Sequence, residues 1–416
     1  MSDIPPPIIV DILSRLPVKS LCRFRCVSKP WLVLINHPRF AKMHLARTHN
    51  QRILFHKRNS LNSLYTVQLE TLSYLRNSIP VEIKLPGNME FDRDYTFGHV
   101  IGSCNGLLCI RDVIALKGFL LYNPSTKECK TIQDVIQNEM IGFGYAESID
   151  DYKILKILWA ANGVRVVKVY SLRKDSWISI PRDIDFGFYA SKSGLVSVNE
   201  AIHFVTYYYE RPTVITAFDL VEDKFKTIPL PPDFMLDKFK FSIKIGHLGG
   251  CLCLSIRTDS TSKELWVMKE ELWVMKEYGV SGSWTKILRT KPDDMRSRLL
   301  FPICYLNNNE TILLRREMTK LMFWDSEYEE FKNVEISNAQ DELIVDNVYV
   351  ESLVSPNRIN GFTNEDNENN EELLGYWLTK KTMECEEKNV VYAFGPFSNC
   401  RLDFRERFGT NSVYVT

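Results

Sequence analysis

Residues 122–132 read YNPSTKECKTI, and their pattern of apolar and polar positions returns three times further along the chain. In each copy an aromatic residue is followed seven positions later by a bulky residue and ten positions later by Ile or Val. The aromatic residues that open the four copies are Tyr122, Tyr170, Phe218 and Trp324. Because a short polar run separates the apolar positions, each copy predicts a β-hairpin whose flanking side chains face one core.

A fifth, imperfect copy has Glu277 in the aromatic position, with Trp284 and Ile287 after it, so successive copies begin 48, 48, 59 and 47 residues apart. A four-stranded propeller blade occupies roughly 40–50 residues. Glycine-led apolar runs precede three of the copies: GLLCI at 106–110, GLVSV at 194–198 and GCLCL at 250–254. Such runs suit the inner strands of a blade. The spacing predicts a β-propeller-like (kelch-type) domain, and a large β-sandwich is the alternative.

The heptapeptide ELWVMKE occurs twice in succession, at 264–270 and 271–277. Removing one copy shortens the long interval from 59 to 52 residues, closer to its neighbours. Seven is an odd number, so in one continuous strand the two copies direct equivalent side chains to opposite faces. We therefore expect one copy in the blade and the other in a lengthened loop or hairpin that exposes Trp266 or Trp273. We also expect the duplication to be dispensable, with stability unchanged or higher after its deletion.

Residues 4–40 read IPPPIIVDILSRLPVKSLCRFRCVSKPWLVLINHPRF and differ from the rest of the chain in their helical periodicity. Their apolar residues form three short stripes: Ile8, Ile9, Ile12, Leu13 and Leu16, then Leu21, Phe24 and Val27, then Trp31, Leu34 and Ile35. Pro17 and Pro30 separate the stripes, so the pattern predicts three short helices. Helices of this length are marginal alone, and the first is apolar on more than one face. Another surface must therefore cover it.

Composition and charge narrow the class of protein. The 416 residues are 45% hydrophobic and 25% charged, as in globular chains of two or three domains. We find no transit peptide, no signal-peptide pattern and no apolar run of ~18 residues, and we expect a cytoplasmic or nuclear protein without a membrane or nucleic-acid partner. The net charge of zero conceals +9 over residues 1–60 and −10 over residues 301–416. This asymmetry indicates different partners at the two ends.

The spacing of residues 4–31, followed by Pro38, Arg39 and Phe40, resembles an F-box. Proteins of that family dock this motif on the Skp-type adaptor of a cullin–RING ubiquitin ligase, and their C-terminal domain captures a client. The resemblance implies that eight residues face the adaptor: Ile4, Pro5, Ile8, Ile9, Ile12, Leu16, Pro17 and Val18. It implies that six others hold the helices together: Leu13, Leu21, Phe24, Val27, Trp31 and Leu34. Pro6 and Pro7 stand where the family usually has acidic residues, which removes negative charge from the start of the first helix.

The remainder resembles the plant F-box-associated domain through GSCNGLLCI, LYNPSTKECKTI, VYSLRKDSWISIP and YVESLVSP. The last phrase, with ELWVMKEYGV and SWTKI, is most similar to the S-locus F-box group, which acts in pollen self-incompatibility. The resemblance divides the chain into an F-box at 1–45, a connecting segment with the first strands at 46–100, and a client-binding β domain at 101–416. It implies a non-catalytic subunit that recruits a client, such as a non-self pistil S-ribonuclease, for ubiquitination and proteasomal degradation.

Other functions remain open at this level. A different plant F-box receptor would take a defence or signalling client, and an F-box protein can also act outside the ligase. A propeller enzyme such as a glycoside hydrolase would need two carboxylates converging within ~5–10 Å. The sequence has no Walker A loop, no HExxH and no GxSxG, and its histidines lack metal-ligand spacing. We therefore expect no catalytic residues, no cofactor and no metal.

Residues 364–372 read NEDNENNEE and predict an exposed acidic loop. An acidic surface favours a basic client, because it raises the association rate and penalises like-charged competitors. The S-ribonucleases implied by the resemblance are commonly basic. Five acidic residues are the candidate client-binding residues: Glu365, Asp366, Glu368, Glu371 and Glu372. A purely solubilising role is the alternative.

Overall fold

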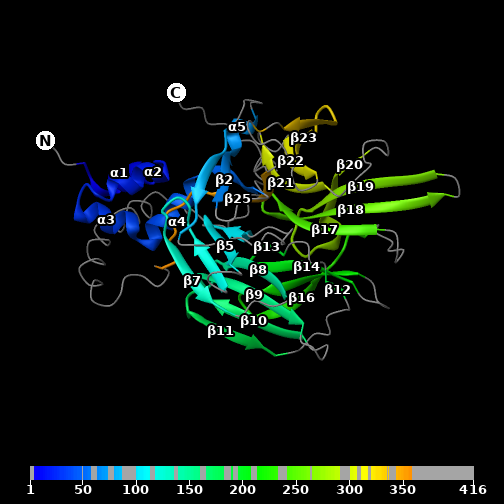
Figure 1. Ribbon diagram of the computed structural model, residues 1–416, viewed down its shortest axis with the longest axis horizontal. Coiled ribbons are helices and arrows are strands. Elements are labelled where there is room, and N and C mark those ends of the chain that lie inside the picture. Colours follow the sequence, from blue (N-terminus) through cyan, green and yellow to red (C-terminus); the bar gives the residue numbers. More distant parts are fainter. Residues whose placement is uncertain are drawn as a thin grey trace, which may run out of the picture.

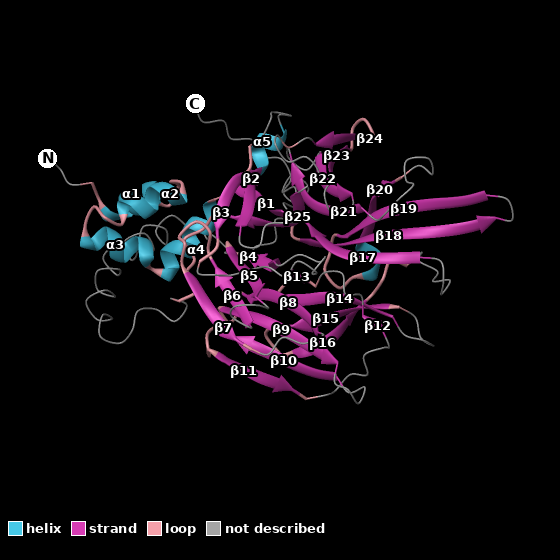
Figure 2. Ribbon diagram, in the orientation of Figure 1, coloured by secondary structure: helices cyan, strands magenta, loops and turns pink. Residues whose placement is uncertain are grey.

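A computed structural model gives the structure of the chain. The ranges that it describes are 4–48, 50–57, 63–73, 79–86, 100–112, 118–134, 139–159, 165–181, 189–190, 195–207, 213–232, 241–262, 265–290, 300–306, 311–316, 320–334, 336 and 343–357. A unit of α-helices at the N-terminus lies beside a large body of β-sheets (Figures 1 and 2). None of the described helices has the length and apolar character needed to cross a bilayer.

The helical unit has four helices among the described residues, one more than predicted. They are α1 (Pro6–Leu13), α2 (Val18–Phe24), α3 (Lys29–Asn36) and α4 (Pro38–Arg47). The additional helix begins at Pro38, after the three helices that the sequence predicts. Proline suits a first helical turn, and the His37 side chain caps this turn by accepting a hydrogen bond from the Arg39 amide at 3.1 Å.

The β-strands form six sheets, which we call blades 1 to 6. In order of hydrogen bonding, blade 1 is β25 (Leu343–Val350), β1 (Gln51–Lys57), β2 (Ser63–Gln68) and β3 (Val81–Lys84). Blade 2 is β4 (Val100–Cys104), β5 (Leu107–Asp112), β6 (Gly118–Tyr122) and β7 (Cys129–Gln133). Blade 3 is β8 (Glu139–Ala146), β9 (Asp151–Trp159), β10 (Arg165–Ser171) and β11 (Ser176–Ile180). The short helix α5 (Leu69–Ser73) lies between β2 and β3.

Blades 4 to 6 repeat this order. In blade 4, β12 (Tyr189–Ala190) and β13 (Val196–Val198) pair with opposite ends of one edge of β14 (Ala201–Tyr207), and β15 (Val214–Asp219) and β16 (Lys224–Ile228) follow. Blade 5 is β17 (Phe241–Leu248), β18 (Cys251–Ser262), β19 (Leu265–Met275) and β20 (Trp284–Arg289). Blade 6 is β21 (Leu300–Leu306), β22 (Thr311–Arg316), β23 (Lys320–Asp325) and β24 (Glu330–Val334). One 3-10 turn, η1 (Ser281–Ser283), precedes β20.

The six blades form a closed propeller. The first strands of successive blades lie against one another, as β25 does with β4, β4 with β8 and β17 with β21. The ring closes within blade 1, where the last strand of the described chain pairs antiparallel with the first, so that Ile53 faces Val348. The prediction of a propeller is confirmed, and the alternative sandwich is wrong. The strands expected within residues 46–100 are β1, β2 and β3 of the closing blade.

The repeated sequence pattern corresponds to the outer hairpin of a blade. The aromatic residue and the residue seven positions later are direct cross-strand partners, as in Tyr170 and Trp177 or Phe218 and Phe225. A positive φ falls five positions after the aromatic residue, where the chain reverses: Lys127, Asp175, Asp223 and Glu329. Such a residue completes a tight hairpin turn. The imperfect copy differs, because Trp284 pairs with Met275 and not with Glu277. Its hairpin is longer and includes η1.

The duplicated heptapeptide lies in one continuous strand, β19. Its second copy occupies the blade, because β20 pairs with Glu271–Met275. Its first copy pairs with the end of β18, from Ser262 opposite Leu265 to Thr258 opposite Lys269. The two strands project as the long ribbon seen in Figure 1. The expected lengthened hairpin is thus confirmed. Trp273 is buried, and the side chain of Trp266 lies outside the described part.

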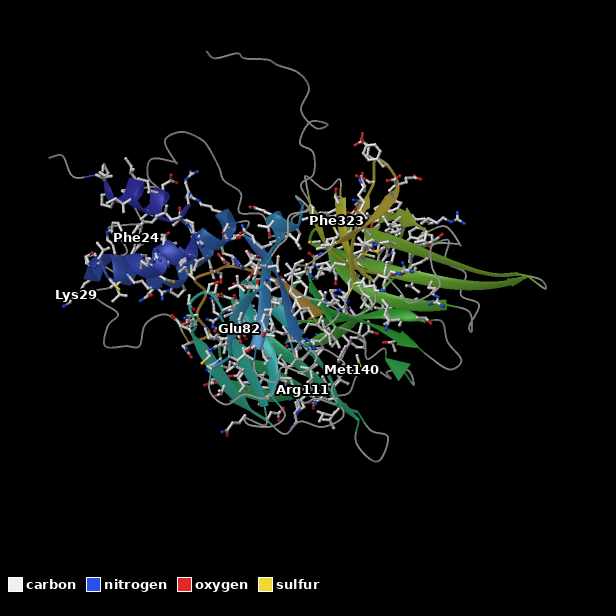
Figure 3. The ribbon with its side chains drawn as sticks, turned by 45° about the horizontal axis from the view of Figure 1, so that its top comes forward. Phe24, Lys29, Glu82, Arg111, Met140 and Phe323 are labelled. Carbon is white, nitrogen blue, oxygen red and sulfur yellow. The ribbon has the colours of Figure 1, made fainter. Side chains whose placement is uncertain are left out.

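Apolar side chains fill the spaces between neighbouring blades, and one such core extends into the helical unit. Figure 3 shows Phe24 within that unit, where its ring meets Trp31 edge-on with centroids 5.5 Å apart. This shared core contains helical residues and propeller residues together: Val10, Leu13, Leu21, Leu34, Leu107, Phe119, Tyr152 and Leu353. The helical unit is therefore packed onto blades 2 and 3 rather than attached by a free linker.

Candidate functional site

The first helix presents an apolar stripe to solvent. Ile4, Ile8 and Ile12 follow one another at four-residue spacing, and their exposed fractions are 58%, 50% and 50%. Val10 and Leu13 lie on the other side of α1 and are buried in the shared core. Ile8 and Ile12 stand above one another on α1 and form one exposed apolar surface, and Ile4 lies exposed in the segment just before the helix begins at Pro6. A contiguous exposed apolar surface of this kind indicates a protein interaction site.

The other predicted adaptor residues divide by burial. Pro5 and Pro17 are exposed, while Ile9 and Leu16 are half-buried against the shared core. Val18 requires a correction: it is only 2% exposed, because it opens α2 with its side chain directed into the core. Its side chain is therefore not part of the surface that α1 presents.

Val27 also differs from the expectation that it holds the helices together. Its side chain is 62% exposed. The reason is local, since α2 ends at Phe24 and Val27 belongs to the turn that follows, outside the helical stripe. Leu13, Leu21 and Leu34 occupy the interior as expected.

Polar contacts fasten α1 to α4. The Arg47 guanidinium pairs with the Asp11 carboxylate at 2.9 Å and also contacts the Ser14 hydroxyl. The His44 ring donates from Nε2 to the Leu16 carbonyl oxygen at 2.8 Å. Burial lowers the pKa of His44, so the ring stays neutral near pH 7. The sequence pattern identified the apolar stripe but not these polar contacts, because their partners are up to 36 positions apart.

The helical unit in turn contacts one face of the propeller, which we call the turn face. This face carries the turns that join first to second strands and third to fourth strands. Lys42 of α4 pairs with Asp150 in the β8–β9 turn at 2.7 Å, and the Tyr145 hydroxyl donates to the same carboxylate at 2.7 Å. Arg25 approaches Glu128 in the β6–β7 turn at 3.5 Å. These contacts give α1 a defined direction relative to the propeller.

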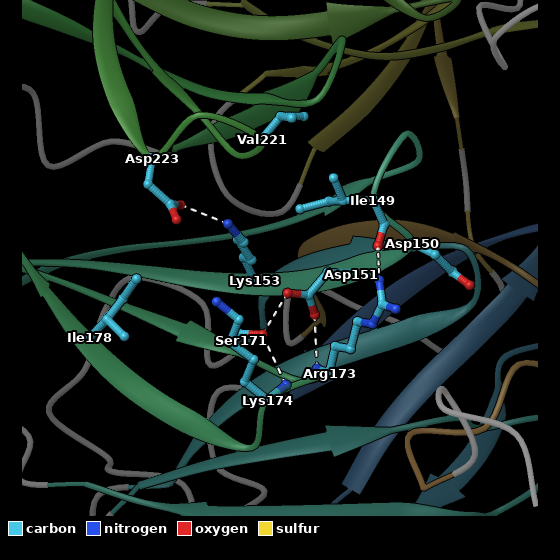
Figure 4. Close-up of a pocket in the computed structure, with 10 residues that line it drawn as sticks. All are labelled: Ile149, Asp150, Asp151, Lys153, Ser171, Arg173, Lys174, Ile178, Val221 and Asp223. Atoms are coloured by element: carbon cyan, nitrogen blue, oxygen red, sulfur yellow. Dashed lines mark hydrogen bonds and ion pairs between the residues drawn. The ribbon is translucent and has the colours of Figure 1, made fainter.

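A cleft of about 690 Å³ opens on the turn face between blades 3 and 4 (Figure 4). Ten residues line it: Ile149, Asp150, Asp151, Lys153, Ser171, Arg173, Lys174, Ile178, Val221 and Asp223. We call it the blade 3–4 cleft. Of the two adjacent acidic residues, only Asp150 lies in the β8–β9 turn. Asp151 begins β9 and is buried, where it accepts hydrogen bonds from the Ser171 hydroxyl and the Arg173 amide.

The acidic residues proposed for client binding lie outside the described residues. Glu365, Asp366, Glu368, Glu371 and Glu372 all follow residue 357, where the described part of the chain ends. Within the described part, no group of three or more His, Cys, Asp or Glu side chains is arranged to hold a metal ion.

Comparison with known families agrees with both parts of this architecture. A model of the F-box domain matches residues 1–43, and a model of the F-box associated beta propeller domain matches residues 53–356. The second match alone spans more than half of the chain. The protein therefore belongs to the F-box proteins that carry an F-box-associated β-propeller.

Curated relatives come from Arabidopsis thaliana. F-box protein CPR1 is 29% identical over 375 residues, which cover 81% of this chain and 86% of that protein. An F-box/kelch-repeat protein is 29% identical over 301 residues, covering 69% of this chain and 79% of its own length.

Proposed function

We propose that this protein is the client receptor of a Skp–cullin–F-box ubiquitin ligase. The observation that carries the proposal is the exposed stripe of Ile4, Ile8 and Ile12 on an F-box that is itself packed against a propeller. The adaptor covers the stripe, and the propeller holds a client. The receptor performs no covalent step. It accelerates ubiquitin transfer by keeping the client and the conjugating enzyme together at high effective concentration.

The adaptor contact is tested by charge substitution in the stripe. Burying one Ile side chain contributes roughly 1.5–3 kcal/mol, so Ile8→Asp with Ile12→Asp should weaken adaptor binding at least a hundredfold. Binding is measured by co-purification and titration with a purified Skp-type adaptor. Val280→Asp is a matched control, because Val280 is an exposed apolar residue on blade 5. If the double variant binds the adaptor as tightly as the unmodified protein, the proposal is wrong.

The client is a second part of the proposal. We propose a basic secreted ribonuclease of the pistil, with the chain acting in pollen self-incompatibility. Support comes from the S-locus-like phrases in the sequence and from the net charge of −10 over residues 301–416. A receptor with a defence or signalling client is the alternative. Cellular turnover of candidate clients, with the intact F-box and with the Ile8 and Ile12 substitutions, distinguishes the two and also tests action inside the ligase.

The acidic run has its own test. Five residues are changed to Ser or Asn: Glu365, Asp366, Glu368, Glu371 and Glu372. Screening acts over ~8 Å at ~0.15 M salt, so a steering role gives client association a steep salt dependence that these changes flatten. Unchanged rates and salt slopes would leave the run a solubilising segment.

A further inference from the structure

Blade 3 departs from a rule that the neighbouring blades follow. In blades 2 to 5, the first and third residues of the second strand face the next blade. The pairs at these positions in blades 2 to 5 are Leu107 and Cys109, Asp151 and Lys153, Ala201 and His203, and Cys251 and Cys253. All eight are buried, yet only blade 3 of these four places charged groups there. A local break in such a pattern is expected where a protein has a functional site.

The two charges of blade 3 have different surroundings. Asp151 accepts hydrogen bonds of 2.5 Å from the Ser171 hydroxyl and 2.9 Å from the Arg173 amide, so its charge is well satisfied. Lys153 reaches across to blade 4, where its amine meets the Asp223 carboxylate at 2.7 Å. An ammonium has three N–H donors. Asp223 is the one carboxylate that pairs with Lys153 in the described part of the chain, and Figure 4 shows this amine at the wall of the cleft.

The rim of the cleft adds further positive charge. Arg173 and Lys174 lie in the β10–β11 turn and are exposed, and the Arg173 guanidinium donates to the Ile149 carbonyl oxygen at 2.9 Å. No carboxylate pairs with Lys174 among the residues that the structure describes. The acidic residue at the rim, Asp150, is already paired with Lys42. The acidic groups of the cleft are therefore held by partners, whereas donor capacity remains at Lys153 and Lys174.

Apolar side chains complete the blade 3–4 cleft. Ile149, Ile178 and Val221 line it beside the charged residues, and the core between the two blades lies directly below. A volume of about 690 Å³ falls within the range of cavities that bind small ligands or single side chains of a partner. The lining fits an anionic group with an aliphatic group next to it.

We propose that the blade 3–4 cleft binds an anionic residue in an extended segment of the client, with the anion at Lys153 and Lys174 and a neighbouring aliphatic side chain on Ile178 and Val221. This inference rests on the proposed function, since it names a client contact. The cleft binds one anionic residue of the client, whereas the net charge of the whole client, which is basic in our proposal, governs its approach to the receptor. Asp150, which lines the cleft, also pairs with Lys42 of the helical unit, so a client held in the cleft lies close to the unit that binds the adaptor.

The test uses full-length receptor with its adaptor and fluorescein-labelled peptides of sequence GSGLELGS. Three matched peptides replace the central Glu by Gln, Lys or phosphoserine, and a fourth ends at the central Glu with a free carboxylate. Binding is measured by fluorescence anisotropy. We expect the Glu peptide to bind about tenfold more tightly than the Gln peptide, and the Lys peptide to bind most weakly. The phosphoserine and free-carboxylate peptides identify which source of the anion binds best.

Two variants locate the binding to the cleft. Lys174→Ala changes an exposed side chain and leaves the fold intact, and Lys153→Met removes the buried amine while keeping its length. Each should weaken binding of the anionic peptides about tenfold. Lys276→Ala is the control, since Lys276 is an exposed lysine on the turn face of blade 5, and it should change nothing.

Equal binding of the Glu, Gln and Lys peptides, or tighter binding of the Lys peptide, would overturn the proposal. So would anion-selective binding that Lys174→Ala leaves unchanged. Adaptor co-purification from the same samples separates this result from the proposed function. A receptor that binds the adaptor but no anionic peptide loses only the cleft assignment, whereas loss of adaptor binding in the unmodified receptor contradicts the ligase role itself.

Discussion

The side-chain amide of Asn123 donates a 2.7 Å hydrogen bond to the backbone carbonyl oxygen of Val354, 231 positions further along the chain. The same amide donates to the Ser352 carbonyl oxygen at 3.1 Å, and the Asn123 Oδ1 accepts from the Ser125 amide at 2.8 Å. One buried side chain thus holds the segment after β25 against the outer hairpin of blade 2. It reinforces the closure of the ring beyond the strand pairing of β1 with β25.

We predict that Asn123→Asp lowers the free energy of unfolding by roughly 2–3 kcal/mol. The substitution removes both N–H donors and places a carboxylate oxygen against two carbonyl oxygens. Chemical denaturation measures the change. Ser125→Ala in the same turn is the control, because the Ser125 hydroxyl is buried with no hydrogen-bond partner in the described structure and its removal should be neutral or stabilising. Equal effects of the two changes would contradict a role for Asn123 in closure.

The contact between Arg47 and Asp11 should matter for adaptor binding more than for overall stability. Arg47→Met removes the ion pair between α4 and α1, so the apolar packing of Val10 and Leu13 is left to orient the isoleucine stripe. We expect a five- to tenfold weaker affinity for the adaptor, corresponding to about 1–1.4 kcal/mol. The thermal midpoint of the propeller should stay near that of the unmodified protein. Arg15→Met is the control, since Arg15 pairs with the same Asp11 but is largely exposed.

The structure revises the expectation that the duplicated heptapeptide is dispensable. Because the two copies are identical, deleting either one gives the same chain, in which Lys263 directly precedes the remaining copy. Lys263 then occupies the position of Glu270. The Glu270 side chain is buried, accepts a 2.6 Å hydrogen bond from the Ser255 hydroxyl and also accepts one from the Leu300 amide. Arg257 and Arg316 lie near enough to act on its charge.

We therefore predict that deletion of one heptapeptide lowers the free energy of unfolding by on the order of 3 kcal/mol, since a lysine replaces a buried carboxylate among two arginines. Deletion combined with Lys263→Glu restores the carboxylate and should recover most of the loss. Thermal unfolding of the three proteins is the measurement. If both deletion variants are equally unstable, the projecting ribbon itself supplies the stability.

His203 makes the stability of blades 4 and 5 depend on pH. The ring is fully buried, bonds the Val196 carbonyl oxygen through Nδ1 and accepts from the Tyr278 hydroxyl at 2.6 Å. Burial lowers the pKa of His203 from 6.5 to about 4. Between pH 4 and pH 6.5 the unfolded chain thus binds a proton at His203 and the folded chain does not. The stability that the neutral His203 ring contributes to the folded state is therefore complete above pH 6.5 and is lost as the pH falls towards 4.

We expect the unmodified protein to lose roughly 3 kcal/mol of stability to this one group over that interval. His203→Gln cannot titrate, and the difference in stability between the two proteins should shrink by that amount from pH 7 to pH 4. Comparing the two proteins cancels the carboxylates, which titrate in both. A constant difference across the interval would mean that His203 is protonated in the folded state.

Local repetition made the propeller predictable. Each outer hairpin brings together residues seven positions apart, such as Tyr170 and Trp177, so its signal lies within one short window of sequence. The helical periodicity of α1 was equally local, and it identified the exposed isoleucines. The fourth helix differs because its apolar residues are few, and only Pro38, a favourable first helical residue, marks its start in the sequence.

The remaining features depend on distant partners. Nothing near Asp11 in the sequence marks Arg47 as its partner. Likewise, only the structure shows that Lys153 occupies the blade position that Cys109 and His203 occupy in the neighbouring blades. Val18 is buried because it opens α2 on the side that faces the core, and Val27 is exposed because α2 ends before it, at Phe24. Register and helix ends of this kind are set by the packing of the whole molecule.

The pairing of β1 with β25 also determines when this protein can finish folding during its synthesis. About 300 residues separate the two strands, and a ribosome that adds ~5–20 residues per second needs roughly 15–60 s to deliver the second after the first. Throughout that time the apolar side of the helical unit lacks Leu353 and its neighbours. The nascent chain thus keeps part of this apolar surface exposed until residue 353 has been synthesised, so the late arrival of β25 lengthens the time during which the chain can aggregate.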